Sequence, residues 1–151
     1  MAGDAIASLP SSPGSYALVF SLAERRAVRV GALGSVVLKP GFVIYVGSAF
    51  GPGGLRARVS RHARIEKPLH WHIDYLRCHL ELEEAWLTTF VERREHEWAG
   101  RLGGRLEIAA ARFGASDCRC ASHLFHTAAR PVATIVGGDE DIIVWRPQPS
   151  M

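Results

Sequence analysis

The chain has few cysteines and no long apolar run. Only three of its 151 residues are cysteine, and this odd number indicates a reducing cytoplasm rather than a framework of disulfides. No stretch approaches the roughly 20 apolar residues of a membrane-spanning helix, and residues 1–13 lack the basic and apolar regions of a signal peptide. Internal repeats and low-complexity segments are also missing. We therefore expect a cytoplasmic protein without a membrane partner.

The remaining composition is typical of one globular domain. Hydrophobic residues make up 48% and charged residues 22% of the chain, which supports a single moderate core. The net charge is only +3, but basic residues concentrate in one stretch, namely Arg56, Arg58, Arg61, Arg64 and Lys67. Such a run is usually a solvated helix face, and beside a phosphate site it indicates a nucleic-acid interface. We expect a flexible segment at 1–12, the domain at 13–130, and an extension at 131–151 with one added strand and a loose tail.

The basic stretch coincides with a predicted helix over residues 55–65, opened by two glycines and ended before Pro68. At about 100° per residue, Arg58 and His62 fall on the apolar face with Leu55 and Val59. A charged pair on this face is costly unless it meets an anion or a carboxylate. Guanidinium is the group best shaped to bind phosphate, so Arg58 is a candidate phosphate ligand.

The hydrophobic periodicity predicts a small α+β structure with a central antiparallel sheet flanked by helices. Residues 70–78 fit either a strand or a helix. The residues predicted as strands are 16–22, 27–30, 35–38, 42–46 and 84–91, with late strand residues at Ile135 and 142–145, and a helix is predicted at 92–102. Gly47 is expected to let the chain leave the sheet before the glycine-rich approach to the helix.

Five motifs follow one another in an order that resembles the GIY-YIG endonuclease superfamily. They are Pro13-Gly14-Ser15-Tyr16, Tyr45-Val46-Gly47-Ser48-Ala49, the pair Arg58 and His62, His70-Trp71-His72-Ile73-Asp74-Tyr75-Leu76, and the segment from Phe113 to Phe125. The last two resemble its Uri-type branch. This resemblance covers most of the chain and implies a GIY-YIG-type domain, a helix at 70–78, and metal-dependent hydrolysis of DNA, as in the nuclease module of DNA excision repair.

The resemblance implies a role for each catalytic candidate. Tyr16 would activate or position the attacking water with Tyr45 as its partner, and Arg58 would hold the scissile phosphate. A tyrosine accepts a proton only where cationic neighbours stabilise its phenolate, and Arg58, a metal-bound water and His62 are the candidates. For His62, a place at the edge of the core is the alternative to proton transfer.

The carboxylate expected from the resemblance lies on the helix after the third strand. Glu95 best matches the family position, and it shares a helix face with Ala99 and Leu102. Its rival Glu97 shares a face with arginines. Glu95 is therefore expected to be the sole protein ligand of Mg²⁺ or Mn²⁺, with water filling the other positions. The chain departs from the family pattern at Ser15, where many relatives have an apolar residue, and at His96, where this branch often has cysteine.

Three groups of polar residues have other predicted roles. We expect Arg56, Arg61, Arg64, Lys67, His70 and His72 to contact nucleic acid. The spacing of His70, His72 and Asp74 favours a structural network or such contacts over a second metal, because these residues converge only on a strand. Cys118, Cys120, His123 and His126 are chemically suited to zinc, but they lack the long loop of usual finger sites. We therefore expect a turn with buried thiols and no zinc.

These features predict a metal-dependent endonuclease that acts on DNA, with RNA left open as a substrate. The alternative is a non-catalytic nucleic-acid-binding module of the same fold. Tyr16, Tyr45, Arg58 and Glu95 together favour the enzyme, because binding alone needs only the basic face. A zinc-bearing interaction protein is a third and weaker interpretation that depends on the cysteine segment.

Overall fold

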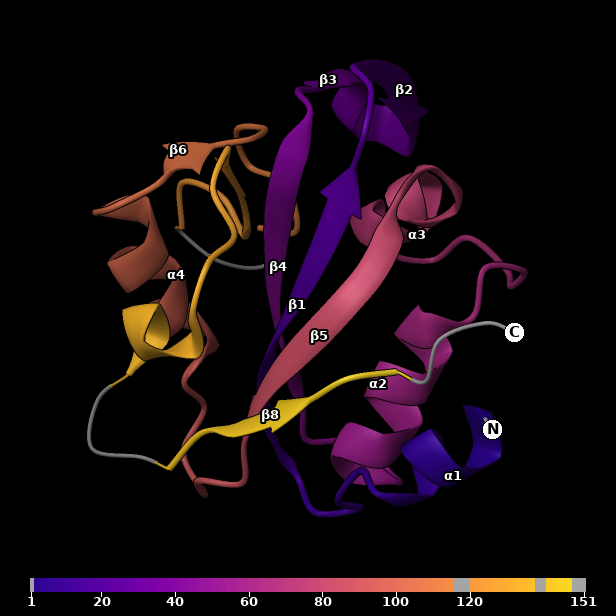
Figure 1. The fold of residues 1–151 in the computed structure, drawn as a ribbon, viewed down its shortest axis with the longest axis vertical. Helices are drawn as coiled ribbons and strands as arrows, with labels where there is room; N and C mark the ends of the chain where they lie inside the picture. The colour runs from indigo at the N-terminus through magenta and orange to yellow at the C-terminus, as the bar shows by residue number, and fades with distance from the viewer. Residues whose placement is uncertain (1, 116–119, 138–140, 148–151) are drawn as a thin grey trace.

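The protein folds around one antiparallel sheet, as seen in a computed structural model that describes residues 2–115, 120–137 and 141–147. The six strands lie in the order β6-β7-β4-β1-β5-β8 (Figure 1). They are β1 (Gly14–Leu22), β4 (Gly41–Ala49), β5 (Glu81–Thr88), β6 (Glu107–Ile108), β7 (Leu124–Thr127) and β8 (Ile143–Trp145). A separate hairpin pairs β2 (Arg26–Val30) with β3 (Gly34–Leu38). The predicted α+β class with a central antiparallel sheet is confirmed.

Helices cover both faces of the sheet. The helices are α1 (Ala2–Ala7), α2 (Gly54–Ala63), α3 (His72–Leu76) and α4 (Glu95–Gly103), with 3₁₀ turns η1 (Gly31–Leu33), η2 (Arg77–His79) and η3 (Ala133–Val136). In Figure 1, α2 and α3 lie to the right of the central strands and α4 lies to the left. Side chains of β1 alternate between two cores: Tyr16 and Leu18 pack with α2 and α3, whereas Ala17 and Val19 pack with α4. Each large apolar side chain buried in these cores stabilises the fold by about 1.5–3 kcal/mol.

Several element ends differ from the predicted ones. Strand β4 runs on through Gly47 to Ala49, because its residues stay in register with β1 until Ala49 lies opposite Gly14. The prediction that the chain leaves the sheet at Gly47 was therefore wrong. Strand β5 ends at Thr88 rather than Val91, and α4 begins at residue 95 rather than 92.

The N-terminal segment is packed onto the domain, although its composition predicted a flexible stretch. It forms α1, and the side chain of Leu9 is fully buried. Trp145 of β8 donates a hydrogen bond from Nε1 to the carbonyl of Ala5 at 2.7 Å. This added strand therefore holds α1 in place. The tail predicted to be loose is 147–150, and its residues 148–150 lie outside the described residues.

The structure also defines two other segments for which the sequence predicted a helix or strand. Residues 70–78 contain the helix α3 and the turn η2 rather than a strand. Ile135 lies in η3 and not in a strand, whereas residues 143–145 do form the predicted late strand. Within the part of the chain that the structure describes, every helix is too short or too polar to cross a membrane.

Candidate active site

Two tyrosines on neighbouring strands face one histidine of α2. Tyr16 Oη lies 2.8 Å from Nε2 of His62, within hydrogen-bond distance, and the Tyr45 ring meets the same imidazole edge-on at 5.9 Å between centroids. Tyr16 lies directly opposite Gly47 in the β1–β4 register. A Cβ atom at Gly47 would collide with the Tyr16 phenol. Glycine is therefore required at this position for the tyrosine to lie across β4.

Burial keeps these groups uncharged at neutral pH. It raises the pKa of Tyr16 far above its usual value, an effect that nearby Arg58 opposes only in part. The pKa of Tyr45 is also raised by burial and, secondly, by Tyr16. Burial and then Lys67 lower the pKa of His62 to about 3. A neutral phenol therefore contacts a neutral imidazole, which favours a positioning role for Tyr16 over that of a phenolate base.

His62 also carries an unsatisfied polar atom. Its Nδ1 is buried and has no hydrogen-bond partner among the described residues. Buried polar atoms of this kind are rare, because each leaves a desolvation cost uncompensated. The buried nitrogen therefore carries a desolvation cost that the described contacts do not offset.

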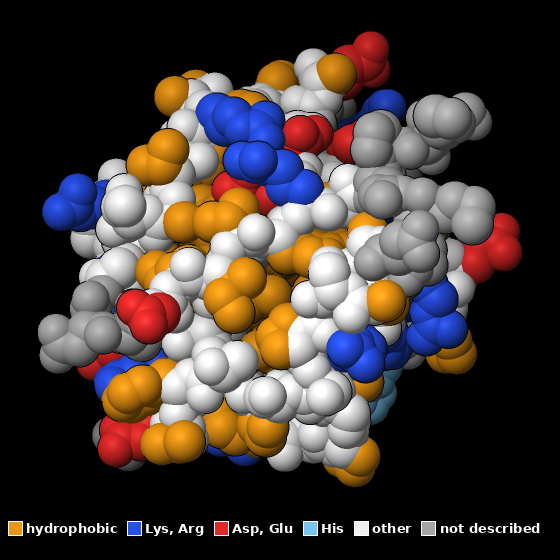
Figure 2. Space-filling model, turned by 60° about the horizontal axis from the view of Figure 1, so that its bottom comes forward, with side chains coloured by type: hydrophobic (Ala, Val, Ile, Leu, Met, Phe, Trp, Pro, Cys, Tyr) orange, Lys and Arg blue, Asp and Glu red, His pale blue; other side chains and the backbone are white. Residues whose placement is uncertain are grey.

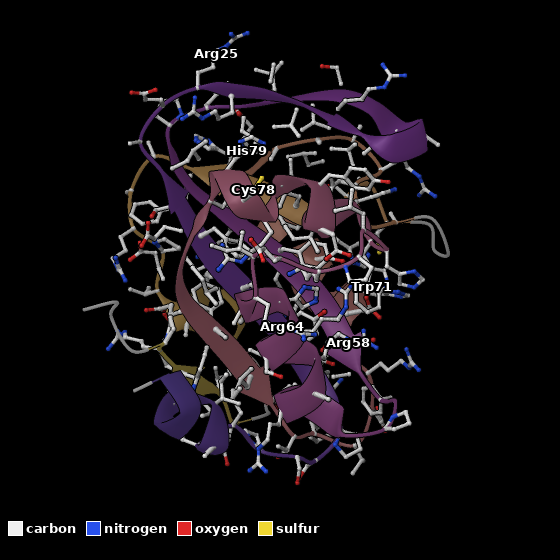
Figure 3. All side chains as sticks on the ribbon, turned by 90° about the vertical axis from the view of Figure 1, so that its right-hand side faces the viewer. Arg25, Arg58, Arg64, Trp71, Cys78 and His79 are labelled. Atoms are coloured by element: carbon white, nitrogen blue, oxygen red, sulfur yellow. The ribbon has the colours of Figure 1, made fainter. Side chains whose placement is uncertain are left out.

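Arg58 lies at the more exposed side of the cluster. Its guanidinium group stacks 4.5 Å from the ring centroid of Trp71 and donates from Nη1 to the carbonyl of Ser48 at 2.9 Å (Figure 3). The side chain is half-buried, so part of the guanidinium remains accessible. Stacking and the backbone hydrogen bond fix the guanidinium plane. The same guanidinium also acts on Tyr16: burial raises the pKa of that phenol, and the charge of Arg58 and a side-chain hydrogen bond from it lower the pKa in part.

Glu95 is the first residue of α4, and two serines hold it against the sheet. Ser15 accepts a hydrogen bond from the backbone N–H of Arg94 at 2.8 Å, and Ser48 donates from Oγ to Oε1 of Glu95 at 2.7 Å. Ser15, where the chain departs from the family pattern, therefore supplies the buried oxygen that accepts a hydrogen bond at the start of α4. Sequence reasoning missed the role of Ser48. Its place two residues after the buried Val46 gives no signal of which helix it meets.

The two candidate carboxylates have different surroundings. The Glu95 side chain is 17% exposed, and its Oε2 lies 3.4 Å from Nδ1 of His123. Glu97 is 46% exposed and pairs with Arg94 at 3.1 Å and Arg101 at 3.4 Å. The face turned inward by α4 therefore carries Glu95, and Glu97 belongs to a solvated cluster of opposite charges.

Much of the predicted basic interface has partners within the chain. Arg56 donates to the carbonyls of Leu9 and Ala7, and Lys67 donates to three carbonyls at the end of α2. Arg64 remains exposed. On the face that includes the lower end of Figure 1, Lys and Arg side chains form separate groups with uncharged side chains between them (Figure 2). The positive surface is therefore smaller than the sequence predicts.

Arg61 is tied to a buried carboxylate. Its guanidinium makes two hydrogen bonds of 3.0 Å to Asp74. Asp74 also accepts from the backbone N–H groups of His70 and Trp71 at 2.8 Å. Burial alone would raise the pKa of Asp74, but these hydrogen bonds lower it below its usual value. The network clamps α3 to α2.

The histidines near this network do not share a ligand site. His72 Nδ1 accepts a hydrogen bond from the backbone N–H of Gly114 at 2.7 Å, and burial lowers the pKa of His72. His70 is exposed, and its ring contacts Trp71. A structural network therefore accounts for Asp74 and His72.

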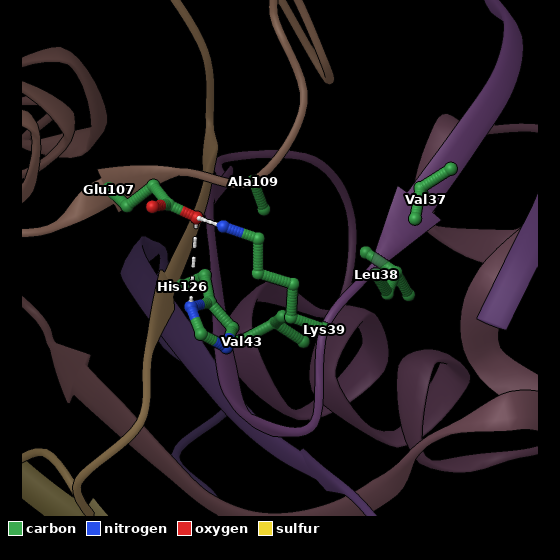
Figure 4. Close-up of a pocket in the computed structure, with 7 residues that line it drawn as sticks. All are labelled: Val37, Leu38, Lys39, Val43, Glu107, Ala109 and His126. Carbon is green, nitrogen blue, oxygen red and sulfur yellow. Dashed lines mark hydrogen bonds and ion pairs between the residues drawn. The ribbon is translucent and has the colours of Figure 1, made fainter. Parts of the chain in front are cut away.

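The cysteine segment divides in two. His126 Nε2 bonds to the carbonyl of Pro40 at 2.9 Å, and its Nδ1 lies 3.9 Å from Glu107, which pairs with Lys39 (Figure 4). His123 instead bonds through Nδ1 to the carbonyl of Val46 at 3.1 Å, and burial lowers the pKa of His123. His126 therefore does not join His123. Cys118 lies outside the described residues.

A divalent cation is chemically compatible with the surroundings of Glu95. The donors there are a partly exposed carboxylate and a serine hydroxyl, and hard cations such as Mg²⁺ prefer oxygen ligands. The negative charge of Glu95 raises the pKa of both Tyr16 and Tyr45, although burial contributes more. Glu95, the two tyrosines and Arg58 therefore belong to one electrostatic unit.

Comparison with known proteins gives one result. No curated protein and no solved structure matches the chain significantly. A scan of protein families matches residues 15–137, a range that runs from the start of β1 through η3 and contains every residue of the candidate site. The chain therefore belongs to the family described as Domain of unknown function DUF123.

Proposed function

We propose that this protein is a metal-dependent endonuclease of GIY-YIG type that cleaves phosphodiester bonds in DNA in the cytoplasm. The observation that carries the proposal is the convergence of two helices, α2 and α4, on Ser48 of β4. Its carbonyl accepts from Arg58 of α2, and its hydroxyl donates to Glu95 of α4. A phosphate-binding group and a cation-binding group are thereby held on either side of one residue at the end of β4, beside Tyr16.

The groups divide the reaction among them. A water oxygen attacks the phosphorus and gives up a proton, the bond to the leaving oxygen breaks, and that oxygen takes up a proton, so the proton count is unchanged. Arg58 would bind the phosphate and stabilise the charge that grows on it. Mg²⁺ or Mn²⁺ held by Glu95 would supply charge neutralisation and an acidified water. Tyr16 and His62 lie deeper in the protein than Arg58 and Glu95. Their hydrogen bond orients the phenol toward the attacking water.

Burial supports this order of contacts. Arg58 and Glu95 are partly exposed, whereas Tyr16 is 1% and His62 is 1% exposed. A phosphate approaching from solvent would therefore meet the arginine and the cation first. Burying the neutral pair below them fixes its geometry before substrate arrives, which lowers the cost of ordering in the transition state.

The test separates chemistry from binding. Single-stranded, duplex and branched DNA are incubated with the protein, with and without Mg²⁺ or Mn²⁺. Arg58→Ala and Glu95→Ala should each lower cleavage by about a hundredfold or more, as loss of one preorganised charge-stabilising group does. Glu97→Ala is the matched control on the same helix and should cut as wild type does.

Two outcomes would overturn the proposal. If the wild-type chain binds DNA but cuts none of the substrates with either metal, the non-catalytic binding module replaces the enzyme. If Glu97→Ala is inactive and Glu95→Ala cuts normally, the cation is held elsewhere on α4. RNA of the same sequences serves as the competing substrate.

A further inference from the structure

Three side chains with nitrogen or sulfur donors meet beside α4. They are His96, the second residue of α4, and Cys120 and His123, which precede β7. One donor atom from each lies within 4.8 Å of the other two. His96 stands next to Glu95, and both side chains approach His123, but no sequence motif linked His96 to the cysteine segment.

The geometry suits a zinc ion. Zinc binds imidazole nitrogen at about 2.0–2.1 Å and thiolate sulfur at about 2.3 Å, so the ligand atoms of a tetrahedral site lie roughly 3.3–3.8 Å apart. The donor atoms lie within 4.8 Å of one another, so the separations exceed the tetrahedral values by about 1.5 Å at most. His96 is exposed, and rotation of its side chain can close this gap. The imidazoles of His96 and His123 face each other edge-on, 5.8 Å between centroids.

The surrounding structure holds two of the donors in place. Nδ1 of His123 bonds to the carbonyl of Val46 and lies 3.4 Å from Oε2 of Glu95. Nε2 is therefore the nitrogen that would bind the metal, as in protein zinc sites where the second imidazole nitrogen binds a carbonyl. The backbone N–H of His123 donates to the carbonyl of Phe113 at 2.7 Å. Arg112 donates from Nη1 to the carbonyl of Cys120 at 2.8 Å. Such fixed outer contacts are what a preformed metal site needs.

We propose that His96, Cys120 and His123 bind one zinc ion, with Cys120 as thiolate. The ion links the first turn of α4 to the segment before β7. It therefore fixes the start of the helix that carries Glu95. The proposal replaces the expectation of a metal-free turn, because that expectation considered only donors close in sequence. It does not depend on nuclease activity.

The experiment measures metal content in the full-length chain. Protein purified without chelator or affinity metal should carry one zinc per chain by elemental analysis. Exchange with Co²⁺ should produce the charge-transfer absorption of a cobalt–thiolate bond. His96→Ala, whose side chain lies on the surface, should lose both signals while the far-ultraviolet circular dichroism stays unchanged. Cys120→Ser should abolish the thiolate band.

Matched controls come from η2, where Cys78 and His79 are neighbours and both are exposed (Figure 3). Cys78→Ser and His79→Ala should keep the zinc and the cobalt spectrum. A chelator should lower the melting temperature of the wild type by several degrees and leave His96→Ala unaffected. The proposal fails if the wild type holds no zinc after reconstitution, or if His96→Ala retains the full zinc content and the cobalt spectrum.

Discussion

Replacing Ser48 with alanine removes the hydroxyl that donates to Oε1 of Glu95 at 2.7 Å and leaves the carbonyl that accepts from Arg58. A hydrogen bond to a charged group is worth about 1.5–3 kcal/mol. If Glu95 needs this bond to hold its cation in the transition state, the loss lowers the cleavage rate by about 10- to 150-fold, since 1.36 kcal/mol corresponds to a factor of ten. Binding of uncleaved DNA should stay unchanged because the arginine keeps its place.

The assay follows cleavage of the best DNA substrate at increasing Mg²⁺, and DNA binding is measured separately without metal. Ser48→Ala should raise the Mg²⁺ concentration needed for half-maximal cleavage, and Ser48→Thr, which keeps a hydroxyl, should restore most of the activity. Ser60→Ala is the control, because its hydroxyl bonds only to the carbonyl of Ala57 in its own helix. A Ser48→Ala protein with wild-type cleavage and metal response would refute the positioning of Glu95 by this residue.

Three further predictions concern stability and binding. The pKa of His62 is about 3 in the folded chain and near 6.5 when unfolded, so protons bind the unfolded chain preferentially below pH 6.5. The free energy of unfolding, measured by urea titration, should fall by on the order of 2 kcal/mol from pH 7 to pH 5. The fall should be smaller for His62→Gln than for His79→Gln, which keeps His62. Equal falls would contradict the buried neutral imidazole. Arg64→Ala should weaken DNA binding and reduce the salt slope by about one, whereas Arg61→Ala should lower the unfolding free energy by about 1–3 kcal/mol through loss of its bonds to Asp74. An unchanged salt slope for Arg64→Ala would place the DNA elsewhere.

The sequence predicted the elements with regular periodicity. Strand β1 was readable because its larger apolar side chains, such as Tyr16 and Leu18, alternate with the smaller Ala17 and Val19. The period of α2 separates the buried Leu55, Val59 and His62 from the more exposed residues of the helix. Strand ends were less accurate. Periodicity does not tell whether Gly47 ends β4, because pairing with β1 decides that. The short strands β6 and β7 were not predicted, since two to four residues are too few to show a period.

The side-chain partners were harder to predict than the elements. Arg56 and Arg61 look like solvent-exposed cations on a helix wheel. Their partners, two carbonyls of the N-terminal segment and the carboxylate of Asp74, come from other parts of the chain. The sequence shows which residues can donate hydrogen bonds, but it does not show which distant segments of the chain come close to them. The grouping of His96 with Cys120 and His123 was missed for the same reason. These residues meet only because α4 packs beside the segment that leads into β7.

The register between β1 and β4 explains why the candidate site forms at this end of the sheet. Residues directly opposite one another in an antiparallel pair project to the same face. Tyr16 lies opposite Gly47 and faces α2, whereas Ser15 lies opposite Ser48 and faces α4. One pair therefore gives the tyrosine room to meet His62, and the other binds the start of α4. A shift of one residue would exchange the two faces and remove Glu95 from Ser48. Ser15-Tyr16 and Gly47-Ser48 must therefore stay in this register for Arg58, Tyr16 and Glu95 to act together.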